Sequence, residues 1–475
     1  MRTRALLLTT ILLTSALAAG RATAQDAPAP VTIAAGGLVN PRGFTWDVSG
    51  AMLVAEAGTG GDTAPTAEVP PPTGPYRGGP TARVSRIEAG CPVTVADGLP
   101  SAVSAAGETL GVADVALVGG RLLALVAGGG AAHGNPDSPA GIYELKDGEA
   151  ALVVDLSDHL RSVPAVSEPP TVDADPDGAL YSMVAKPTGD GVWIAERNSG
   201  QVLLVGLVDP FVARLADLSA DHAMPTALAV DADGSLYVGM FSSAPYAAGS
   251  AYVLKVGAAA DTTPLAAPER VWTGLTMVTG LAVGPDGALY ATEFSSARDQ
   301  PPFFVAATGR VLRQTGPDTS QEVLTQLNFP TATRFGPDGA LYVSLPGVGA
   351  DDGTGVVVRA DLSGSLPIPA GSYDLTAAAC APGDVEGAIR VSIYDFGFDP
   401  SVLTVTVGAT VTWVNEGAVD HTTVAFAGGG TTWDSDLLAP GDEYSHTFDE
   451  VGAFAYVCGL YPDMHGTIDV VPTGP

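Results

Sequence analysis

The sequence predicts an all-β protein, a six-bladed β-propeller followed by a small β-sandwich. An Asp-Gly turn between alternating apolar segments recurs at Gly234, Gly287 and Gly339, 53 and 52 residues apart. Such turns are a strong hairpin signal, because glycine accepts a positive φ without a Cβ clash. Glycine and proline contribute 59 and 38 of 475 residues in a chain that is 46% hydrophobic. This mix indicates a turn-rich β protein rather than a disordered one.

The charge balance argues against two classes of partner. The chain has 52 Asp and Glu against 21 Lys and Arg, a formal net charge of −31. Nucleic-acid binding relies on basic side chains that neutralise phosphates, and docking on anionic membranes relies on basic segments. We therefore expect neither nucleic acid nor an anionic membrane surface as a partner.

Residues 1–24 are predicted to be a secretory signal peptide. Arg2 and Arg4 precede an apolar run over residues 5–19, and small residues at 22–24 offer a cleavage site. The apolar run is shorter than the roughly 20 residues that a spanning helix needs, so no membrane insertion is expected after cleavage. The mature chain is expected to be secreted or periplasmic, where disulfides are permitted.

Residues 25–365 repeat one unit six times, and each unit contains up to four short strands. The fourth strand that the last unit lacks is found instead at residues 31–35, so the N-terminal strand is predicted to close a ring by completing the last blade. Four-stranded units spaced about 40 to 50 residues apart are typical of propeller blades. The register of the third blade stays open, because a second Asp-Gly-Ala-Leu-Tyr at residues 177–181 competes with the turn at residues 190–191.

The amino-acid sequence of these repeats resembles the ScyD/ScyE family of predicted propeller proteins. The resemblance is carried by Gly-Leu-Val-Asn-Pro-Arg-Gly at residues 37–43 and Leu-Val-Ala-Glu-Ala-Gly at residues 53–58, and covers roughly residues 30–375. It implies a propeller fold and no particular reaction.

Three glutamates, Glu56, Glu196 and Glu293, stand at the same point of their units, directly after the second strand. Related six-bladed rings include lactonases that hold a metal in the central channel, and three converging carboxylates could bind calcium, which prefers oxygen ligands. The alternative is that they line the channel or anchor loops. We expect an electron carrier or binding protein rather than a lactonase. The histidines of this region stand alone in polar, loop-like sequence and are assigned no role: His133, His159 and His222.

A linker over residues 366–387 separates the repeats from a second domain at residues 388–472. Alternating apolar residues and Gly/Pro turns predict an antiparallel β-sandwich there. Its chemistry lies in His421 and in the ending Cys-Gly-Leu-Tyr-Pro-Asp-Met-His-Gly, which starts at Cys458. The strand alternation is expected to point His446 outward, so we interpret it as a surface residue.

This domain resembles the cupredoxins of the plastocyanin and amicyanin type over about residues 388–471. The resemblance implies electron transfer by blue copper, which needs a thiolate, two imidazoles and a weak axial thioether. By position, His421 matches the first imidazole, Cys458 the thiolate and Met464 the axial ligand. In the usual ending, Cys-x-x-His-Pro-x-Met-x-Gly, the second imidazole precedes the proline, and Tyr461 occupies that position here.

Tyr461 leaves two hypotheses open. A phenol with a pKa of about 10 is a poor replacement for a neutral imidazole. Either His465 supplies the second nitrogen, or the site binds copper weakly or not at all. In the first case the chain is an exported copper-binding electron-transfer protein with an unknown redox partner, and the propeller is its binding or docking module. In the second case it is a non-redox extracellular binding or scaffold protein.

Two cysteines outside the copper motif, Cys91 and Cys380, are predicted to form a disulfide. Cys91 opens the outer strand of the first blade and Cys380 follows the last blade. A closed ring makes those blades neighbours, and the expected compartment is oxidising. The alternative is two separate buried thiols.

Overall fold

The computed structural model describes residues 30–471 except for 68, 71–73, 105–106, 168–174, 244–245, 257–267, 298–303, 351–352, 373–388, 395–396, 400–401, 426–432 and 462–463. Strands dominate the described residues, which contain one α-helix, α1 (Leu156–Ser162). The prediction of an all-β protein is therefore confirmed. None of the helices in the described part has the length and apolarity to cross a membrane.

Residues 31–369 form six separate sheets of four or five strands. Five of them are built from strands that follow one another along the chain: β2 (Pro41–Trp46), β3 (Met52–Glu56), β4 (Tyr76–Glu88), β5 (Cys91–Ser104) and β6 (Thr109–Leu110); β7 (Val112–Val118), β8 (Arg121–Val126), β9 (Gly141–Lys146) and β10 (Glu149–Asp155); β11 (Leu180–Ala185), β12 (Gly191–Glu196), β13 (Gln201–Gly206) and β14 (Phe211–Asp217); β15 (Met224–Val230), β16 (Leu236–Phe241), β17 (Ala251–Val256) and β18 (Glu269–Leu275); and β19 (Val278–Val283), β20 (Leu289–Glu293), β21 (Gly309–Gly316) and β22 (Thr319–Leu327).

The sixth sheet joins the two ends of this region. It contains β23 (Ala332–Phe335), β24 (Leu341–Leu345) and β25 (Gly355–Ala360), and its outer strand is β1 (Val31–Leu38) from the start of the chain. Strands β1 and β25 are antiparallel, with Val31 opposite Ala360. A short strand inside the predicted linker, β26 (Ile368–Pro369), pairs in parallel with β22.

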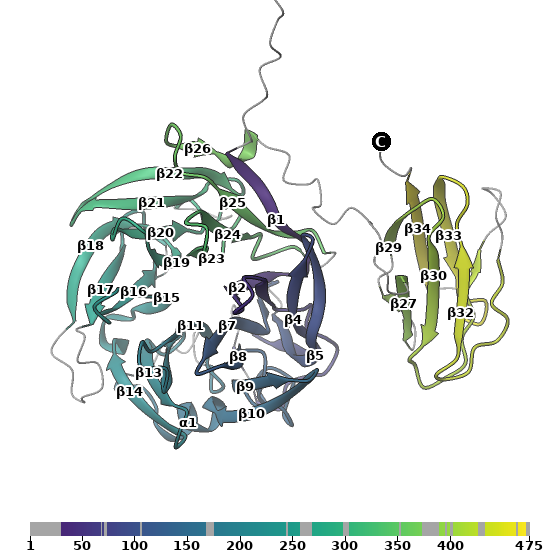
Figure 1. Cartoon of the computed structure of the whole chain (residues 1–475). Helices are drawn as coiled ribbons and strands as arrows, with labels where there is room; N and C mark the ends of the chain where they lie inside the picture. Colours follow the sequence, from purple (N-terminus) through teal and green to yellow (C-terminus); the bar gives the residue numbers. More distant parts are fainter. Residues whose placement is uncertain are drawn as a thin grey trace, which may run out of the picture.

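The six sheets stand in a circle, with one strand of each sheet nearest the centre (Figure 1). These inner strands, β2, β7, β11, β15, β19 and β23, contact one another in this order, and β23 contacts β2. The circle is therefore continuous, although each sheet by itself is open.

The repeated turns adopt the conformation that their glycines predict. Gly234, Gly287 and Gly339 have φ of +79°, +76° and +76°. The competing copy at residues 177–181 is different, because its last residues begin the inner strand β11 and Asp177 is buried. Asp177 accepts a hydrogen bond from Ala132 N at 2.7 Å. The hairpin of the third sheet lies instead at residues 186–191, where Gly189 N donates to Lys186 O.

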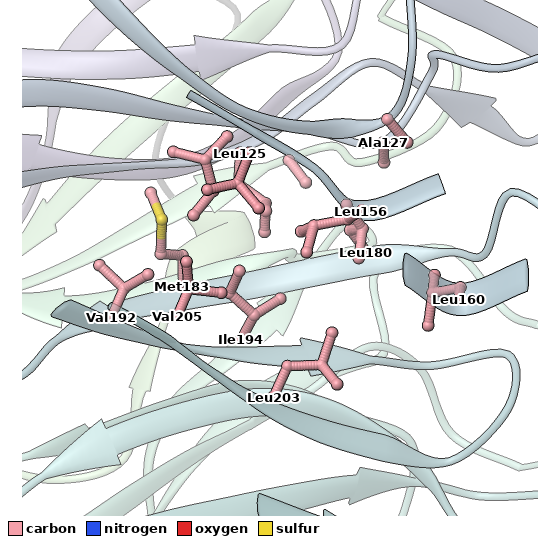
Figure 2. Packing of buried hydrophobic residues seen from close by; sticks show 14 of the residues in the cluster. Leu125, Ala127, Leu156, Leu160, Leu180, Met183, Val192, Ile194, Leu203 and Val205 are labelled. Atoms are coloured by element: carbon pink, nitrogen blue, oxygen red, sulfur yellow. The ribbon is translucent and has the colours of Figure 1, made fainter. Parts of the chain in front are cut away.

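The cores of the ring lie between neighbouring sheets. Figure 2 shows Leu125 of β8 gathered with Val192 and Ile194 of β12, from the next sheet along the chain. Trp193, which alternates with them on β12, packs into the cluster that contains Val238 of β16, on the other side. Because both faces of such a strand are covered, its residues read as one continuous apolar run.

Residues 389–471 form a sandwich of two four-stranded sheets. Their orders are β28-β27-β30-β32 and β29-β34-β33-β31. The bounds are β27 (Ile389–Tyr394), β28 (Gly397–Asp399), β29 (Val402–Thr406), β30 (Thr410–Asn415), β31 (Val424–Ala425), β32 (Glu443–Thr447), β33 (Gly452–Val457) and β34 (His465–Val471). The prediction of a purely antiparallel sandwich is wrong in detail, because β27 pairs with β30 and β29 with β34 in parallel. The chain changes sheets between these strands, so the partners are not sequence neighbours.

Candidate metal centre

The loop after β33 brings two sulfur-bearing side chains into the core of the sandwich. Cys458 follows the last residue of β33 and is fully buried, and Met464 is buried in the same cluster. Cys458 N donates to Met464 O at 3.1 Å, and Met464 N donates to Tyr461 O at 2.9 Å. These bonds close the loop on itself, so the spacing Cys-x5-Met is what places both sulfurs at one end of the sandwich.

His421 reaches the same place from the loop that follows β30. Asn415 fixes that loop, since its side-chain nitrogen donates to Val419 O and Leu438 O, each at 2.8 Å. His421 and Leu438 exchange both backbone hydrogen bonds. The imidazole is thereby buried, and its Nδ1 lies 3.7 Å from Cys458 Sγ.

This geometry fits one bound metal ion. Typical metal–sulfur and metal–imidazole bonds are about 2.3 Å and 2.0 Å, taking zinc as a guide, so one ion can bond two atoms that are 3.7 Å apart. A buried thiol, an imidazole and a thioether form the soft donor set that favours copper. His421, Cys458 and Met464 therefore suit three of the four positions of a blue copper centre.

Thr422 holds the sulfur from the side. Its backbone N–H donates to Cys458 Sγ at 3.4 Å and its hydroxyl lies 4.0 Å from the same atom. The hydroxyl also accepts from Gly459 N at 2.7 Å. Donors aimed at a ligating sulfur stabilise its thiolate form and tune the metal that it binds.

Tyr461 stands beside the imidazole of His421. Its ring centroid lies 5.3 Å from that of His421, with the planes tilted by 56°. The side chain is half-buried and packs against the cluster that contains both sulfurs. A phenol, rather than a second imidazole, therefore borders the donor set.

Comparisons with known proteins agree with this geometry. Residues 385–471 match the family described as copper binding proteins, plastocyanin/azurin family. A plastocyanin of Scenedesmus fuscus is 37% identical over 83 residues, which cover 15% of this chain and 85% of that protein. The chain belongs to the plastocyanin/azurin family of copper-binding proteins.

Two further similarities concern the same C-terminal cupredoxin domain. An amicyanin of Paracoccus denitrificans is 36% identical over 87 residues, 18% of this chain and 66% of the amicyanin. A solved structure described as a novel purple cupredoxin from Nitrosopumilus maritimus is 28% identical and covers 18% of this chain and 99% of its own, with a TM-score of 0.17. The match to the family and to the plastocyanin confirms the cupredoxin resemblance for residues 385–471, and copper binding and electron transfer are the capacities of this family.

The predictions for the other two histidines of the cupredoxin domain, His465 and His446, fare differently. The backbone of His465 pairs with Val457, whereas its side chain lies outside the described residues, so its role as a ligand stays a prediction. The interpretation of His446 as a surface residue is wrong. Its ring stacks on Trp433 at 5.0 Å and 26°, and burial lowers its pKa. Strand β32 covers the edge of the aromatic core, which alternation alone does not show.

The three glutamates of the ring act as loop anchors in the structure. Each sits at the end of the second strand of its sheet and accepts a hydrogen bond from a backbone N–H 17 residues earlier. Glu56 also binds Arg83, Glu293 binds Arg310, and Glu196 accepts from Ser199. They belong to three different sheets. Among the residues placed by the structure, no group of three or more His, Cys, Asp or Glu could hold a metal ion.

The sequence led us to expect an isolated His133. The structure instead places it in a buried polar cluster. Its Nδ1 lies 2.7 Å from Gly129 O and its Nε2 lies 2.8 Å from Asp175 Oδ2. Both side chains of this pair are fully buried. Only the fold brings residues 42 positions apart together, and glycines around His133 were the sole local signal.

Only one cysteine of the predicted disulfide, Cys91, lies among the described residues. Cys91 begins β5, is half-buried and has no disulfide partner among the described residues. Strand β5 contacts β1 of the sixth sheet, and Gly36 N donates to Gly90 O at 3.0 Å, so Cys91 lies at the joint between the first and last sheets. Cys380 lies outside the described residues, and the pairing stays a prediction.

Proposed function

We propose that the chain is an exported electron-transfer protein that binds copper in its cupredoxin domain through His421, Cys458 and Met464. The observation that carries the proposal is the 3.7 Å approach of the buried His421 Nδ1 to Cys458 Sγ. Bound copper would supply one-electron exchange between Cu(I) and Cu(II). Burial excludes water from the thiolate, and Thr422 fixes the direction of the sulfur.

The redox partner is proposed to dock at the loop that contains the candidate ligands. Leu460 has 49% of its surface exposed, two residues beyond the buried Cys458. An exposed apolar residue this close to a metal ligand gives a partner a short path to the metal without opening the core. The export that this role needs is supported by the signal-like pattern of residues 1–24.

The ring is proposed to be a six-bladed β-propeller that serves as the binding or docking module. Six sheets, inner strands in continuous contact, and the addition of β1 to the sheet of β23–β25 support this assignment. Closing a ring with a strand from the other end of the chain protects edges that would otherwise stay open.

Copper titration of the full-length purified chain tests the proposal. We expect saturation at one copper per chain, with a visible thiolate-to-copper absorption band that is lost in Cys458→Ser. Cys91→Ser is the matched control, since it removes the other described cysteine and should leave the band intact. A chain that binds no copper would overturn the proposal and favour the second candidate, an extracellular scaffold with a copper-free cupredoxin domain, for which Tyr461 beside His421 is the supporting observation.

A further inference from the structure

The centre of the ring contains a cavity of about 770 Å³. Its wall includes residues from all six inner strands, such as Arg42, Asp114, Tyr181, Ala227, Gly280 and Arg334. Small-molecule sites usually span about 300 to 1,000 Å³ and are largely preformed. All six inner strands contribute to the wall, and loop residues such as Arg197, Tyr246 and Phe304 complete it, so this cavity has the size of a ligand site.

Asp114 has no acceptor capacity left for a ligand. Its buried carboxylate accepts from Arg334 Nη2 at 2.7 and 2.8 Å, from Val115 N and Met183 N at 2.9 Å, and from Ser182 Oγ at 3.4 Å. A carboxylate offers about four lone-pair sites, so these donors saturate it. Gly43 leaves the space for this arrangement, because a Cβ there would lie 1.9 Å from Asp114 Oδ1.

Two arginines of the wall keep donors to spare. A guanidinium carries five N–H donors. Arg334 uses only Nη2, toward Asp114 and Met183 O. Arg197 uses Nη2 toward Glu108 Oε1, at 2.5 Å. Within the part of the chain that the structure describes, Nε and Nη1 of both arginines have no hydrogen-bond partner.

The polar wall also contains a third guanidinium and a phenol, together with Glu108, Asp221 and His222. Arg42 is held rigidly, since Nη1 donates to Gly347 O and Nη2 donates to Thr109 O at 2.5 and 2.7 Å. The Arg197 guanidinium carbon lies 5.9 Å from the centroid of the Tyr181 ring. Three arginines therefore line one cavity of a chain with only 21 basic residues and 52 acidic ones.

The cavity also has an aromatic wall, formed by Phe241, Tyr246, Phe294 and Phe304. The ring centroid of Phe304 lies 5.1 Å from Tyr246, 5.5 Å from Phe294 and 6.4 Å from Phe241. Edge-to-face and tilted contacts of this kind are favourable for aromatic rings, and a planar ligand can extend them.

We propose that this cavity is a binding site for a small aromatic carboxylate. The unused N–H donors of Arg197 and Arg334 take the carboxylate, and the ring of the ligand lies against the aromatic wall. The unused N–H donors of Arg197 and Arg334 favour an anion over a cation at this wall, because Asp114 is saturated and Glu108 is already paired with Arg197. The site is independent of the copper centre, since every residue in it belongs to the ring.

Calorimetric titration of the full-length chain tests this site with three probes: 2-naphthoate, its neutral analogue 2-naphthalenemethanol, and acetate. We expect one naphthoate per chain, affinity lower by at least about tenfold for the alcohol, and no measurable heat with acetate. A tenfold change corresponds to about one charge-assisted hydrogen bond. Equal affinity for naphthoate and the alcohol, or no binding of naphthoate, would overturn the proposal.

Variants distinguish the polar wall from a general effect on the fold. Arg197→Met should weaken naphthoate binding at least about tenfold, and its partner Glu108 has 34% of its side chain exposed and tolerates the loss. Arg334→Lys keeps a positive charge beside Asp114 and should weaken naphthoate binding, because lysine has fewer N–H donors than arginine. The matched control is Arg359→Met, because Arg359 pairs with Asp338 outside the cavity wall and should leave affinity unchanged. Unchanged affinity in Arg197→Met and Arg334→Lys would contradict the assignment.

Discussion

At the scale of single residues, the chemistry of the copper site depends on Tyr461. Its ring borders His421 in the position where the family motif has a second imidazole. Neutral phenol is a weaker donor than imidazole because its oxygen keeps its proton up to a pKa of about 10. The strength of a copper centre here therefore depends on whether another side chain, such as His465, supplies the nitrogen that Tyr461 lacks.

We predict that Tyr461→His intensifies the visible absorption of the copper-loaded chain. Two imidazoles and a thiolate complete the trigonal plane that gives blue copper its colour. The measurement is the absorption spectrum of the full chain at one equivalent of Cu(II). If His465 already supplies the second nitrogen, the native chain is strongly blue and His465→Ala bleaches it. A native chain that is strongly blue and insensitive to both changes would show that the ligand set is wrong.

A second prediction at the residue scale concerns the buried His133 and the pH dependence of the free energy of unfolding. Both of its ring nitrogens lie within hydrogen-bond distance of oxygen acceptors, Gly129 O and Asp175 Oδ2, which favours the doubly protonated, positively charged imidazole. Burial by itself lowers the pKa of His133, but the carboxylates of Asp175 and Asp177 outweigh burial and raise it above 6.5. A raised pKa in the folded state adds stability below about pH 6.5 that is lost as the pH rises through the folded value.

The free energy of unfolding should therefore fall as the pH rises above about 6.5, and His133→Gln should flatten that part of the profile. Urea denaturation at a series of pH values measures it. His222→Asn is the control, because His222 is exposed and should leave the slope as it is. An identical slope in His133→Gln and the native chain would refute this assignment of the pH dependence.

At the scale of elements, the hairpin turns of the ring depend on glycine. Gly287 has φ of +76° and nothing within 4 Å of the place where a Cβ would stand, so only its backbone conformation opposes a larger residue. The same turn is tied by Asp286, which accepts from Arg313 at 2.7 Å and from the Tyr290 hydroxyl at 3.2 Å. Turn and strand are thus fixed by backbone and side chains together.

Gly287→Ala should lower the free energy of unfolding by about 1 kcal/mol, the usual cost of placing an L-residue in the left-handed region. Thermal and urea unfolding both measure this loss. Gly364→Ala is the matched control, since Gly364 has equal space around it and no positive φ, and it should be neutral or slightly stabilising. Equal effects of the two substitutions would mean that the turn tolerates a side chain.

At the scale of the whole molecule, the ends of the ring region meet. Residues 31–38 join the sheet of residues 332–360, and the outer strand of the first sheet lies against them. The pairing of Val31 with Ala360 joins residues that are more than 300 positions apart in the sequence. A crosslink at this joint would shorten the loops available to the unfolded chain and stabilise the fold.

We predict that Cys91 forms such a crosslink with Cys380 in the exported protein. Mass spectrometry after alkylation without reduction should find the two peptides joined and only Cys458 modified, once copper is removed. Cys380→Ser should then expose Cys91 to alkylation and lower the melting temperature. Two freely alkylated thiols in the native protein would rule out the bridge.

The sequence by itself determined the all-β class, the cupredoxin domain and three candidate ligands. It could do so because period-two alternation and turn glycines are local signals of β-structure. In addition, the candidate ligands near Cys458 lie within one loop, so their spacing in the sequence largely fixes their positions in space. The tertiary structure alone decided the rest. The parallel pairing of β27 with β30, the stacking of the partly buried His446 on Trp433, the His133–Asp175 pair and the arginine-lined cavity join residues that are far apart in the chain. Their positions follow from the packing of whole sheets, which no local pattern encodes.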